Sequence, residues 1–367
     1  MKSQGGGLFM QANRFSMVRK HRDFIFAVLI TALSLLAAAC GSSSSQSSPK
    51  ASTTSSTGPQ TSNVTLRVGY IASLAGGAVP AIGTHFGWYK SAGLNVKFIS
   101  FTNAPAMATA LVGGSLDIML TGANGTLNSL IGYAKLIALD DFDNDSYILT
   151  SAKSGVTNIE ELKGKTVAYT QGTNSEVLVL LALQAANLTA ADITTSNLAP
   201  PSIVSAFLGG KISVASIFLP FSAAITSQQP DTNNISRVSD YLGGTAIPLM
   251  WAASDSALST KMPEIQKYLQ VMARVVDYRR TNLSQSAQIV YQFSGAPSLA
   301  PFTQQITAEQ WPSDSQILSY YNSGLVNGSI NKIESVLNAA HAVKQALPSS
   351  MLDFKVDQSV LTNYLKK

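Results

Sequence analysis

The feature that most constrains the fold is an alternation of short apolar segments with helix-like segments, which starts at residue 66 and later repeats. The first set comprises strand 66–71, helix 78–91, strand 96–101, helix 104–112 and strands 116–120 and 136–139. The second set comprises strand 166–169, helix 175–186, strand 193–197, helix 202–208 and strand 214–218. Such alternation is typical of βαβ units, in which helices cover parallel strands. We therefore expect two α/β lobes, each with a mainly parallel sheet.

An internal repeat supports this division. Residues 110–118 and 206–214 each combine a helix end, two glycines and a buried strand. Glycine adopts the left-handed conformation cheaply, so each pair is expected to turn the chain from its helix back into the sheet. A chance likeness between two common turns is the alternative explanation.

Two segments are expected to connect the lobes. Residues 147–151 lead out of the first lobe, and residues 249–253 lead back into it. Two crossings permit closure by hinge bending. The C-terminal third is mostly helical, and the apolar residues of 264–280 share one helical face, which predicts packing on the outside of the first lobe.

The N-terminus has the pattern of an export signal. Arg19, Lys20 and Arg22 precede an apolar run at 24–39 that is too short to span a bilayer comfortably. Small residues then lead to Cys40, as in a bacterial lipobox, so Cys40 is expected to be the acylated first residue of the mature protein. A plain signal peptide and an uncleaved anchor remain alternatives.

A Ser/Thr-rich segment follows Cys40 and lacks large aliphatic side chains. It cannot bury enough surface to offset its chain entropy and is expected to be a flexible tether. The predicted organisation is a leader at 1–39, a tether at 40–63, lobe 1 at 64–150, lobe 2 at 151–244, and a return to lobe 1 with C-terminal helices at 245–367.

Charge and cysteine content exclude several functions. The leader carries five of the 25 basic residues and one of the 20 acidic residues, so the mature chain is almost neutral and no nucleic-acid partner is expected. Cys40 is the only cysteine, which rules out an internal disulfide and a thiolate metal cluster.

Four motifs together resemble those of the SsuA/THI5-like (NMT1-like) solute-binding proteins. They are Arg-Val-Gly-Tyr at 67–70, the segment 85–96, the segment 110–118 with Thr121 and Gly122, and the segment 159–167 with Gly172 and Thr173. The resemblance implies the type II periplasmic-binding-protein fold. It also implies a receptor that passes a small molecule to the permease of an ABC importer on the extracytoplasmic face of the membrane. The lipid expected on Cys40 would hold the receptor there.

The chain departs from that family pattern at Leu219, which stands where the family often has an acid before the proline. The departure removes a counter-charge for an ammonium group and argues against amine-bearing ligands. The loops also show no arginine or lysine clamp. We therefore expect a neutral or delocalised-anion ligand of the sulfonate, nitrate or pyrimidine-precursor class.

The candidate ligand-binding residues follow the carboxyl ends of predicted strands, where ligands bind in open α/β sheets. These residues are Ser73, Leu74, Thr121, Gly122, Asn124, Gly172, Thr173 and Asn174. Their alternative role is capping of helix N-termini. Phe218, Phe221 and Trp251 are candidates for the apolar part of the ligand, with a place in the core as the alternative.

No catalytic, metal or cofactor site is predicted. Asp140, Asp141, Asp143 and Asp145 lack the glycine and terminal acid of an EF-hand, so a solvated loop is expected there. No nucleophile elbow or phosphate loop is present, which argues against an enzyme. The alternatives to transport are a sensory or adhesive surface lipoprotein on the same fold and a THI5-like pyrimidine-synthesising enzyme.

Overall fold

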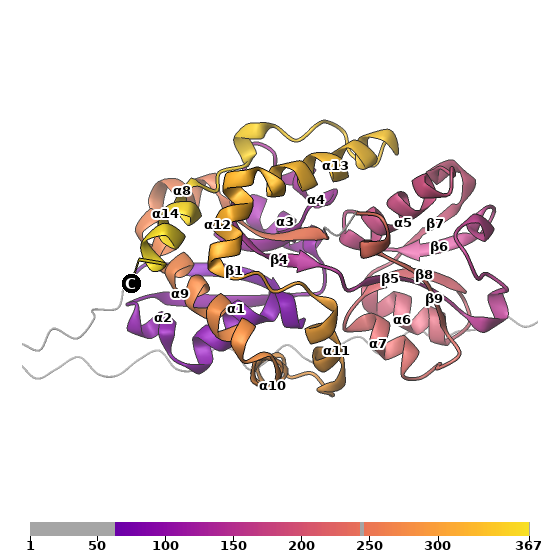
Figure 1. Ribbon diagram of the computed structural model, residues 1–367, viewed down its shortest axis with the longest axis horizontal. Coiled ribbons are helices and arrows are strands. Elements are labelled where there is room, and N and C mark those ends of the chain that lie inside the picture. The colour runs from indigo at the N-terminus through magenta and orange to yellow at the C-terminus, as the bar shows by residue number, and fades with distance from the viewer. Residues whose placement is uncertain (1–62, 243–245, 367) are drawn as a thin grey trace, which may run out of the picture. The chain divides into compact units, whose positions relative to one another are not determined.

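The computed structural model describes residues 63–242 and 246–366 (Figure 1). The predicted leader, the acylation site Cys40 and nearly all of the tether lie outside the described residues. The described residues form one compact unit, which contains two five-stranded sheets. None of the described helices is both long and apolar enough to cross a bilayer.

The first sheet has the order β2-β1-β3-β10-β4. Its strands are β1 (Thr65–Ile71), β2 (Asn95–Phe101), β3 (Ile118–Gly122), β4 (Ala134–Asp143) and β10 (Ile247–Ser254). β1 is parallel to β2 and β3, whereas β10 is antiparallel to both β3 and β4. All strands except β10 therefore run in one direction.

The second sheet has the order β7-β6-β8-β5-β9. Its strands are β5 (Ser146–Thr150), β6 (Thr166–Tyr169), β7 (Thr194–Asn197), β8 (Val214–Phe218) and β9 (Asn233–Arg237). β6 is parallel to β7 and β8, and β5 is antiparallel to β8 and β9. The prediction of two α/β lobes with mainly parallel sheets is confirmed.

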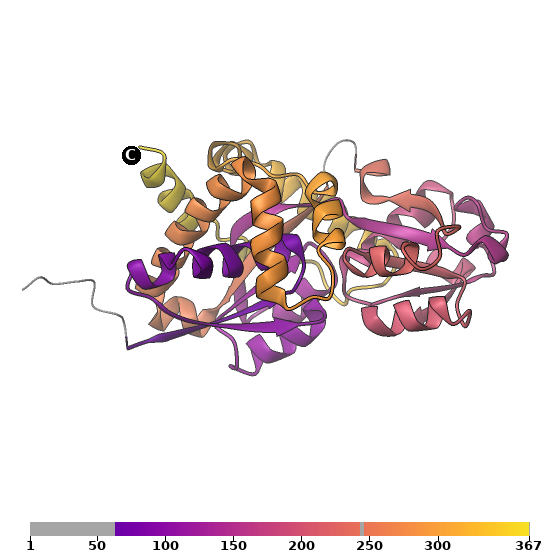
Figure 2. The same cartoon turned by 90° about the horizontal axis from the view of Figure 1, so that it is seen from below.

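Most helices belong to the lobe of the first sheet, as both ribbon views show (Figures 1 and 2). They are α1 (Leu74–His85), α2 (Trp88–Ser91), α3 (Ala104–Val112), α4 (Thr126–Leu130), α8 (Asp255–Thr260), α9 (Met262–Thr281), α10 (Leu283–Ser294), α11 (Ala300–Ala308), α12 (Asp314–Ser323), α13 (Leu325–Ala339) and α14 (Lys355–Tyr364). The second sheet carries α5 (Asn174–Ala185), α6 (Pro200–Leu208) and α7 (Phe221–Thr226). Short 3-10 turns are η1 (Ala152–Ser154), η2 (Glu160–Leu162), η3 (Ala190–Asp192), η4 (Val238–Asp240) and η5 (Ser349–Met351).

The long helix α9 follows its predicted pattern. Its apolar side chains are buried, and it packs against α1 and α14 of the first lobe. The glycine prediction is also confirmed, because the second glycine of each pair is left-handed, with φ of +72° at Gly114 and +68° at Gly210. α3 and α6 end just before these glycines.

The chain passes from the first sheet to the second between Asp143 and Ser146, at the short link from β4 to β5. It returns between η4 and β10. The strand at 146–150 pairs with β8 and β9, so it lies in the second sheet. The change of sheet therefore comes before residue 146, whereas the pattern of apolar residues placed the outward crossing at 147–151.

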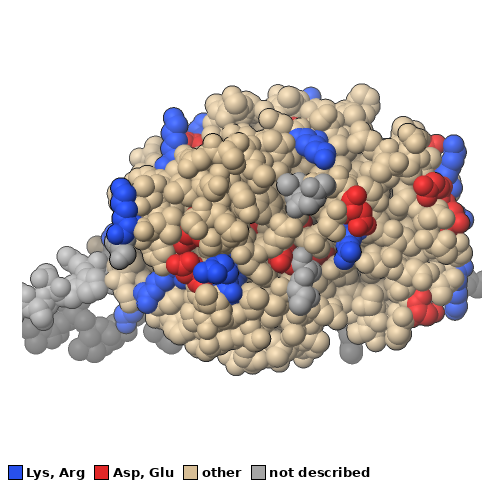
Figure 3. Space-filling view, in the orientation of Figure 1, with Lys and Arg blue, Asp and Glu red and all other residues tan. Residues whose placement is uncertain are grey.

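Charged side chains are sparse on the face shown in Figure 3, where lysines and arginines are interspersed with acids. The more unusual charges are buried. Arg279 on α9 is 1% exposed, and its Nη1 lies 2.8 Å from Asp140 Oδ1 and 3.5 Å from Asp141 Oδ2. Its guanidinium also lies over the Trp311 ring, 4.4 Å from the centroid. This ion pair joins α9 to β4 inside the first lobe.

Candidate functional site

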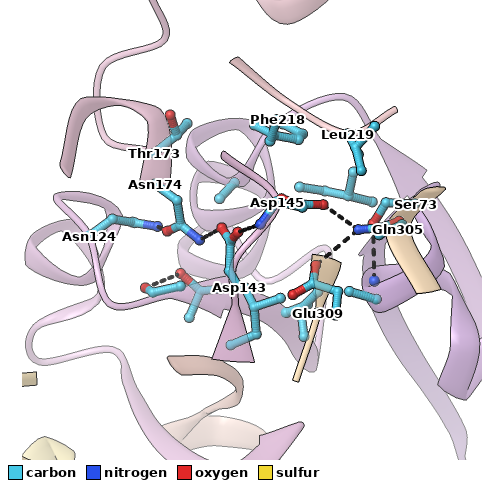
Figure 4. Close-up of a pocket in the computed structure, with 18 residues that line it drawn as sticks. Ser73, Asn124, Asp143, Asp145, Thr173, Asn174, Phe218, Leu219, Gln305 and Glu309 are labelled. Atoms are coloured by element: carbon cyan, nitrogen blue, oxygen red, sulfur yellow. Dashed lines mark hydrogen bonds between the residues drawn. The ribbon is translucent and has the colours of Figure 1, made fainter. Parts of the chain in front are cut away.

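A small cavity of about 60 Å³ lies between the two sheets and receives side chains from both lobes (Figure 4). The strands of the first lobe contribute the end of β1, the end of β3 with the loop after it, the end of β4, and part of β10. Its helices contribute the starts of α1 and α3, together with α11 and Glu309 just after it. The second lobe contributes the start of α5 and the end of β8. Most of these positions follow the carboxyl ends of strands, where open α/β sheets bind their ligands.

Seven of the predicted ligand residues line the cavity: Ser73, Thr121, Gly122, Asn124, Thr173, Asn174 and Phe218. They come together because strand ends of both sheets face the same space. The other four, Leu74, Gly172, Phe221 and Trp251, are not among its lining residues.

Trp251 is fully buried in the core of the first lobe. Its indole nitrogen donates to Asp140 Oδ2 at 2.8 Å, and its ring meets Tyr268 edge to face at 5.7 Å. β10 is an interior strand, and both of its faces are covered. Trp251 therefore takes the alternative role foreseen for it, as a core residue.

The remaining three residues lie next to residues that line the cavity. Phe221 on α7 packs edge to face against Phe218 at 5.5 Å, at the margin of the core of the second lobe. The backbone nitrogen of Leu74 donates to Gln305 Oε1 at 2.5 Å. Gly172 is left-handed, with φ of +75°, and turns the chain into α5.

The hydroxyl groups in the cavity are already paired within their own segments. Ser73 Oγ caps α1 by accepting from the nitrogen of Gly76 at 3.1 Å. The Thr173 hydroxyl donates to the carbonyl of Thr170 at 2.6 Å, and that of Thr121 donates to the carbonyl of Gly122 at 3.2 Å. Capping is therefore the observed contact of Ser73, whereas Thr173 stands at the N-cap position of α5 without capping it.

Side-chain amides connect the two lobes across the cavity. Asn124 Nδ2 donates to Asn174 Oδ1 at 2.7 Å, and Asn174 Nδ2 donates in turn to an Asp143 carboxylate oxygen. Beside them, the Thr126 hydroxyl donates to the carbonyl of Gly172. We call the contact of Asn124, Asn174 and Asp143 the amide bridge. It holds the start of α5 against the ends of β3 and β4.

Three acids form a buried carboxylate cluster on the first-lobe side of the cavity: Asp143, Asp145 and Glu309. They are 4%, 3% and 7% exposed, and one carboxylate oxygen from each lies within 4.8 Å of the others. The nitrogen of Asp145 donates to Asp143 Oδ1 at 2.9 Å, and that of Asn144 donates to Glu309 Oε2 at 3.1 Å. Gln305 Nε2 donates to both Asp145 and Glu309. The end of β4, the link to β5 and the residue after α11 thus bring three acids together.

The electrostatics of the carboxylate cluster follow from burial and from like charge. Burial raises the pKa of Asp145 well above its usual range, and the nearby charges of Glu309 and Asp143 raise it further. Burial raises the pKa of Glu309 to about 8, with the charge of Asp143 acting in the same direction. Among the described lining residues there is no lysine, arginine or histidine to offset these charges.

Comparison with known proteins assigns the chain to a family. The family model described as NMT1/THI5 like matches residues 81–282, which is more than half of the sequence. The chain belongs to the NMT1/THI5-like family. A protein of Brucella abortus (strain 2308), named as a binding protein without a stated ligand, is 27% identical over 266 residues, which cover 72% of this chain and 82% of that protein.

Solved structures share the fold of this NMT1/THI5-like chain. The alkanesulfonate-binding protein SsuA from Xanthomonas axonopodis pv. citri, bound to MOPS, superposes with a TM-score of 0.65 at 19% identity, covering 78% of this chain and 97% of SsuA. The ligand-binding component of an ABC-type import system from Staphylococcus aureus, with zinc bound, gives 0.68 at 13% identity, covering 81% and 98%. These likenesses establish the periplasmic-binding-protein fold, as predicted.

In this NMT1/THI5-like chain, the prediction of a solvated acidic loop was wrong. Asp140, Asp141, Asp143 and Asp145 are all buried rather than in a solvated loop. The first two pair with Arg279, and the last two face the cavity. A signal was available, because these acids follow the carboxyl end of a predicted strand. Nothing in the sequence pointed to Glu309, which joins them from a distant part of the chain.

The carboxylate cluster is also the one group of His, Cys, Asp or Glu side chains in the described parts of the chain that is close enough to hold a metal ion. It offers one oxygen from each of three residues. Calcium takes about six to eight oxygen ligands in proteins, so other groups would have to complete its shell. The site therefore offers three buried carboxyl groups together with side-chain amides and apolar walls.

Proposed function

We propose that this chain is the extracytoplasmic solute-binding protein of an ABC importer. The observation that carries the proposal is the cavity between two lobes, to which both lobes contribute side chains. Family membership and the fold shared with ABC-import receptors support it. In this role the protein captures a small solute outside the cytoplasmic membrane and delivers it to permease subunits.

We further propose that the seven predicted residues lining the cavity contact the solute, with Phe218 against its apolar part. The second lobe is inserted between two segments of the first, and the two connections act as a hinge. A solute that touches both lobes favours the closed arrangement. The amide bridge between Asn124 and Asn174 would close on the bound solute.

The anchoring proposal concerns the N-terminus. We propose that Cys40 is acylated after removal of residues 1–39 and that residues 40–63 tether the lobes to the membrane. Mass spectrometry of protein from a bacterial host should find a lipid-modified N-terminus at Cys40. Unmodified mature protein that begins at another residue would contradict this proposal.

The proposed function is tested by a thermal-shift screen of the full chain against sulfonates, nitrate, pyrimidines, aromatic acids and amines. A compound that binds only the native state stabilises it by about 2.7 kcal/mol at a hundred times its dissociation constant. We expect at least one compound to raise the melting temperature in a saturable way. If no compound in any class does so, the receptor function is wrong.

A further inference from the structure

The charge of the cavity wall limits which solute can enter. Asp143, Asp145 and Glu309 are each more than nine-tenths buried and face the cavity, and none of the described lining residues carries a positive charge. By contrast, the buried acids Asp140 and Asp141 of the first lobe have a cation beside them, Arg279. The carboxylate cluster has only amide and backbone donors among its hydrogen bonds to other residues, apart from the Ser146 hydroxyl.

Burying several acids without a counter-charge is unfavourable, and the penalty falls when a cation joins them. Interactions between charges are also stronger in a cavity shielded from water than in solution. The raised pKa values of Asp145 and Glu309 reflect this penalty, because each acid keeps its proton to a higher pH. A cationic group placed against the carboxylate cluster would favour the ionised form of these acids and pair with it. A sulfonate or nitrate group in the same place would have no cation to pair with among the described lining residues.

The rest of the wall indicates what the cationic group is attached to. Ile71, Ala104, Leu120, Phe218, Leu219 and Leu249 give the cavity an apolar lining. In Figure 4, Phe218 and Leu219 lie on one side of the cavity, with Asp143 and Glu309 on the other. A bare metal ion would leave this apolar surface without a partner. An organic cation would use both sides.

We infer that the solute is a small organic cation, a protonated amine or amidine on a short apolar body, with its charged group against Asp143, Asp145 and Glu309. This inference rests on the proposed receptor function and specifies its ligand class. It differs from the neutral or anionic ligand expected from the sequence. The acids that face the cavity come from the end of β4, the link after it and the residue after α11, and not from position 219.

The test compares probes that share one apolar body. The full chain is titrated by calorimetry with n-butylammonium, n-butanesulfonate and 1-butanol, and separately with zinc chloride. We expect butylammonium to bind about tenfold or more tightly than the other two butyl compounds, as a charge-assisted hydrogen bond predicts. This comparison uses the wild-type protein, so it does not depend on how any variant folds.

Two matched variants locate the charge. Glu309→Gln removes a cavity carboxylate, and Glu334→Gln removes an equally buried one on α13 that does not line the cavity, since both glutamates are 7% exposed. We expect Glu309→Gln to weaken butylammonium binding by about tenfold and Glu334→Gln to leave it unchanged. Asp145→Asn serves as a second cavity variant, and melting curves verify that each variant folds.

The outcomes are distinct. Tighter binding of butanesulfonate, or equal binding of all three butyl compounds, overturns the cationic inference while leaving the receptor function intact. Binding of zinc without butylammonium also overturns it, in favour of a metal receptor. If no probe binds but the wider screen finds an anionic or neutral solute, the inference is wrong and the receptor function stands. If that screen also finds nothing, both are wrong.

Discussion

Gly122 of the first lobe lies close to Asn174 of the second lobe. A Cβ atom built there would lie 2.0 Å from Asn174 Oδ1, the atom that accepts from Asn124 in the amide bridge. No side chain fits at this position while the bridge is formed. The glycine, which the sequence suggested as a ligand contact, is thus required for lobe contact.

Gly122→Ala should therefore obstruct closure and weaken solute binding by about tenfold or more, since about 1.4 kcal/mol of lost closure energy gives that factor. Calorimetric titration with a confirmed solute measures the effect. The matched control is Gly328→Ala in α13, where nothing lies within 4 Å of the added Cβ. It should keep full affinity and gain roughly 0.5–1 kcal/mol of stability. Equal affinity of both variants would contradict the close-contact argument.

Asp314 links stability to pH. Neither of its carboxylate oxygens has a hydrogen-bond partner, and the side chain is 1% exposed at the start of α12. Its pKa is raised from 3.8 to about 8, chiefly by burial and also by the charges of Asp277 and Asp357, while Arg279 and Arg280 act in the opposite direction. The native state therefore holds a proton that the unfolded chain releases between these two pH values.

The stability contributed by this proton is fully present below about pH 4 and is lost as pH rises towards 8, by up to about 1.4 kcal/mol per pH unit. Asp314→Asn removes the linkage. Relative to wild type, the variant should gain unfolding free energy as pH rises from 5 to 8, measured by urea denaturation. A difference that stays constant with pH would show that Asp314 is ionised in the native state.

At the scale of elements, one buried cation links α9 to β4. Arg279 reaches from α9 to Asp140 and Asp141 on β4, and its Nη2 also donates to the carbonyl of Asp140 at 3.2 Å. Removing one member of a buried ion pair leaves the other charge uncompensated, which is more costly than losing a surface contact.

Arg279→Met should therefore lower the free energy of unfolding by about 3–5 kcal/mol. The neighbouring Arg280→Met is the control, because Arg280 is exposed and should change stability by about 0.5 kcal/mol or less. Urea denaturation of both variants makes the comparison. Similar losses for the two would indicate that the ion pair contributes little.

At the scale of the whole molecule, the two connections between the sheets and the amide bridge predict a bending motion. The structure has its lobes in contact through Asn124 and Asn174. We expect the solute-free protein to populate an open form as well, and saturation with solute to favour the closed one. Small-angle scattering should show a smaller radius of gyration with a confirmed solute. An unchanged curve at saturation would contradict hinge closure.

The sequence by itself determined the local structure and the class of fold. Apolar periodicity predicted most strands and helices, and the glycine pairs ended α3 and α6, because backbone preference and side-chain patterning act over a few neighbouring residues. Boundaries were less exact. Strand β3 was predicted at 116–120 but occupies 118–122, because its end is fixed by pairing with the distant strand β10.

Only the tertiary structure decided the chemistry of the cavity. Leu219 suggested that no acid faces the ligand, yet Asp143 and Asp145 meet Glu309 there, from segments far apart in the chain. The same tertiary packing places Trp251 in the core and brings Asn124 into contact with Asn174. Periodicity reports which residues are buried but not which buried residues meet, because contacts between distant segments depend on how the sheets and helices pack.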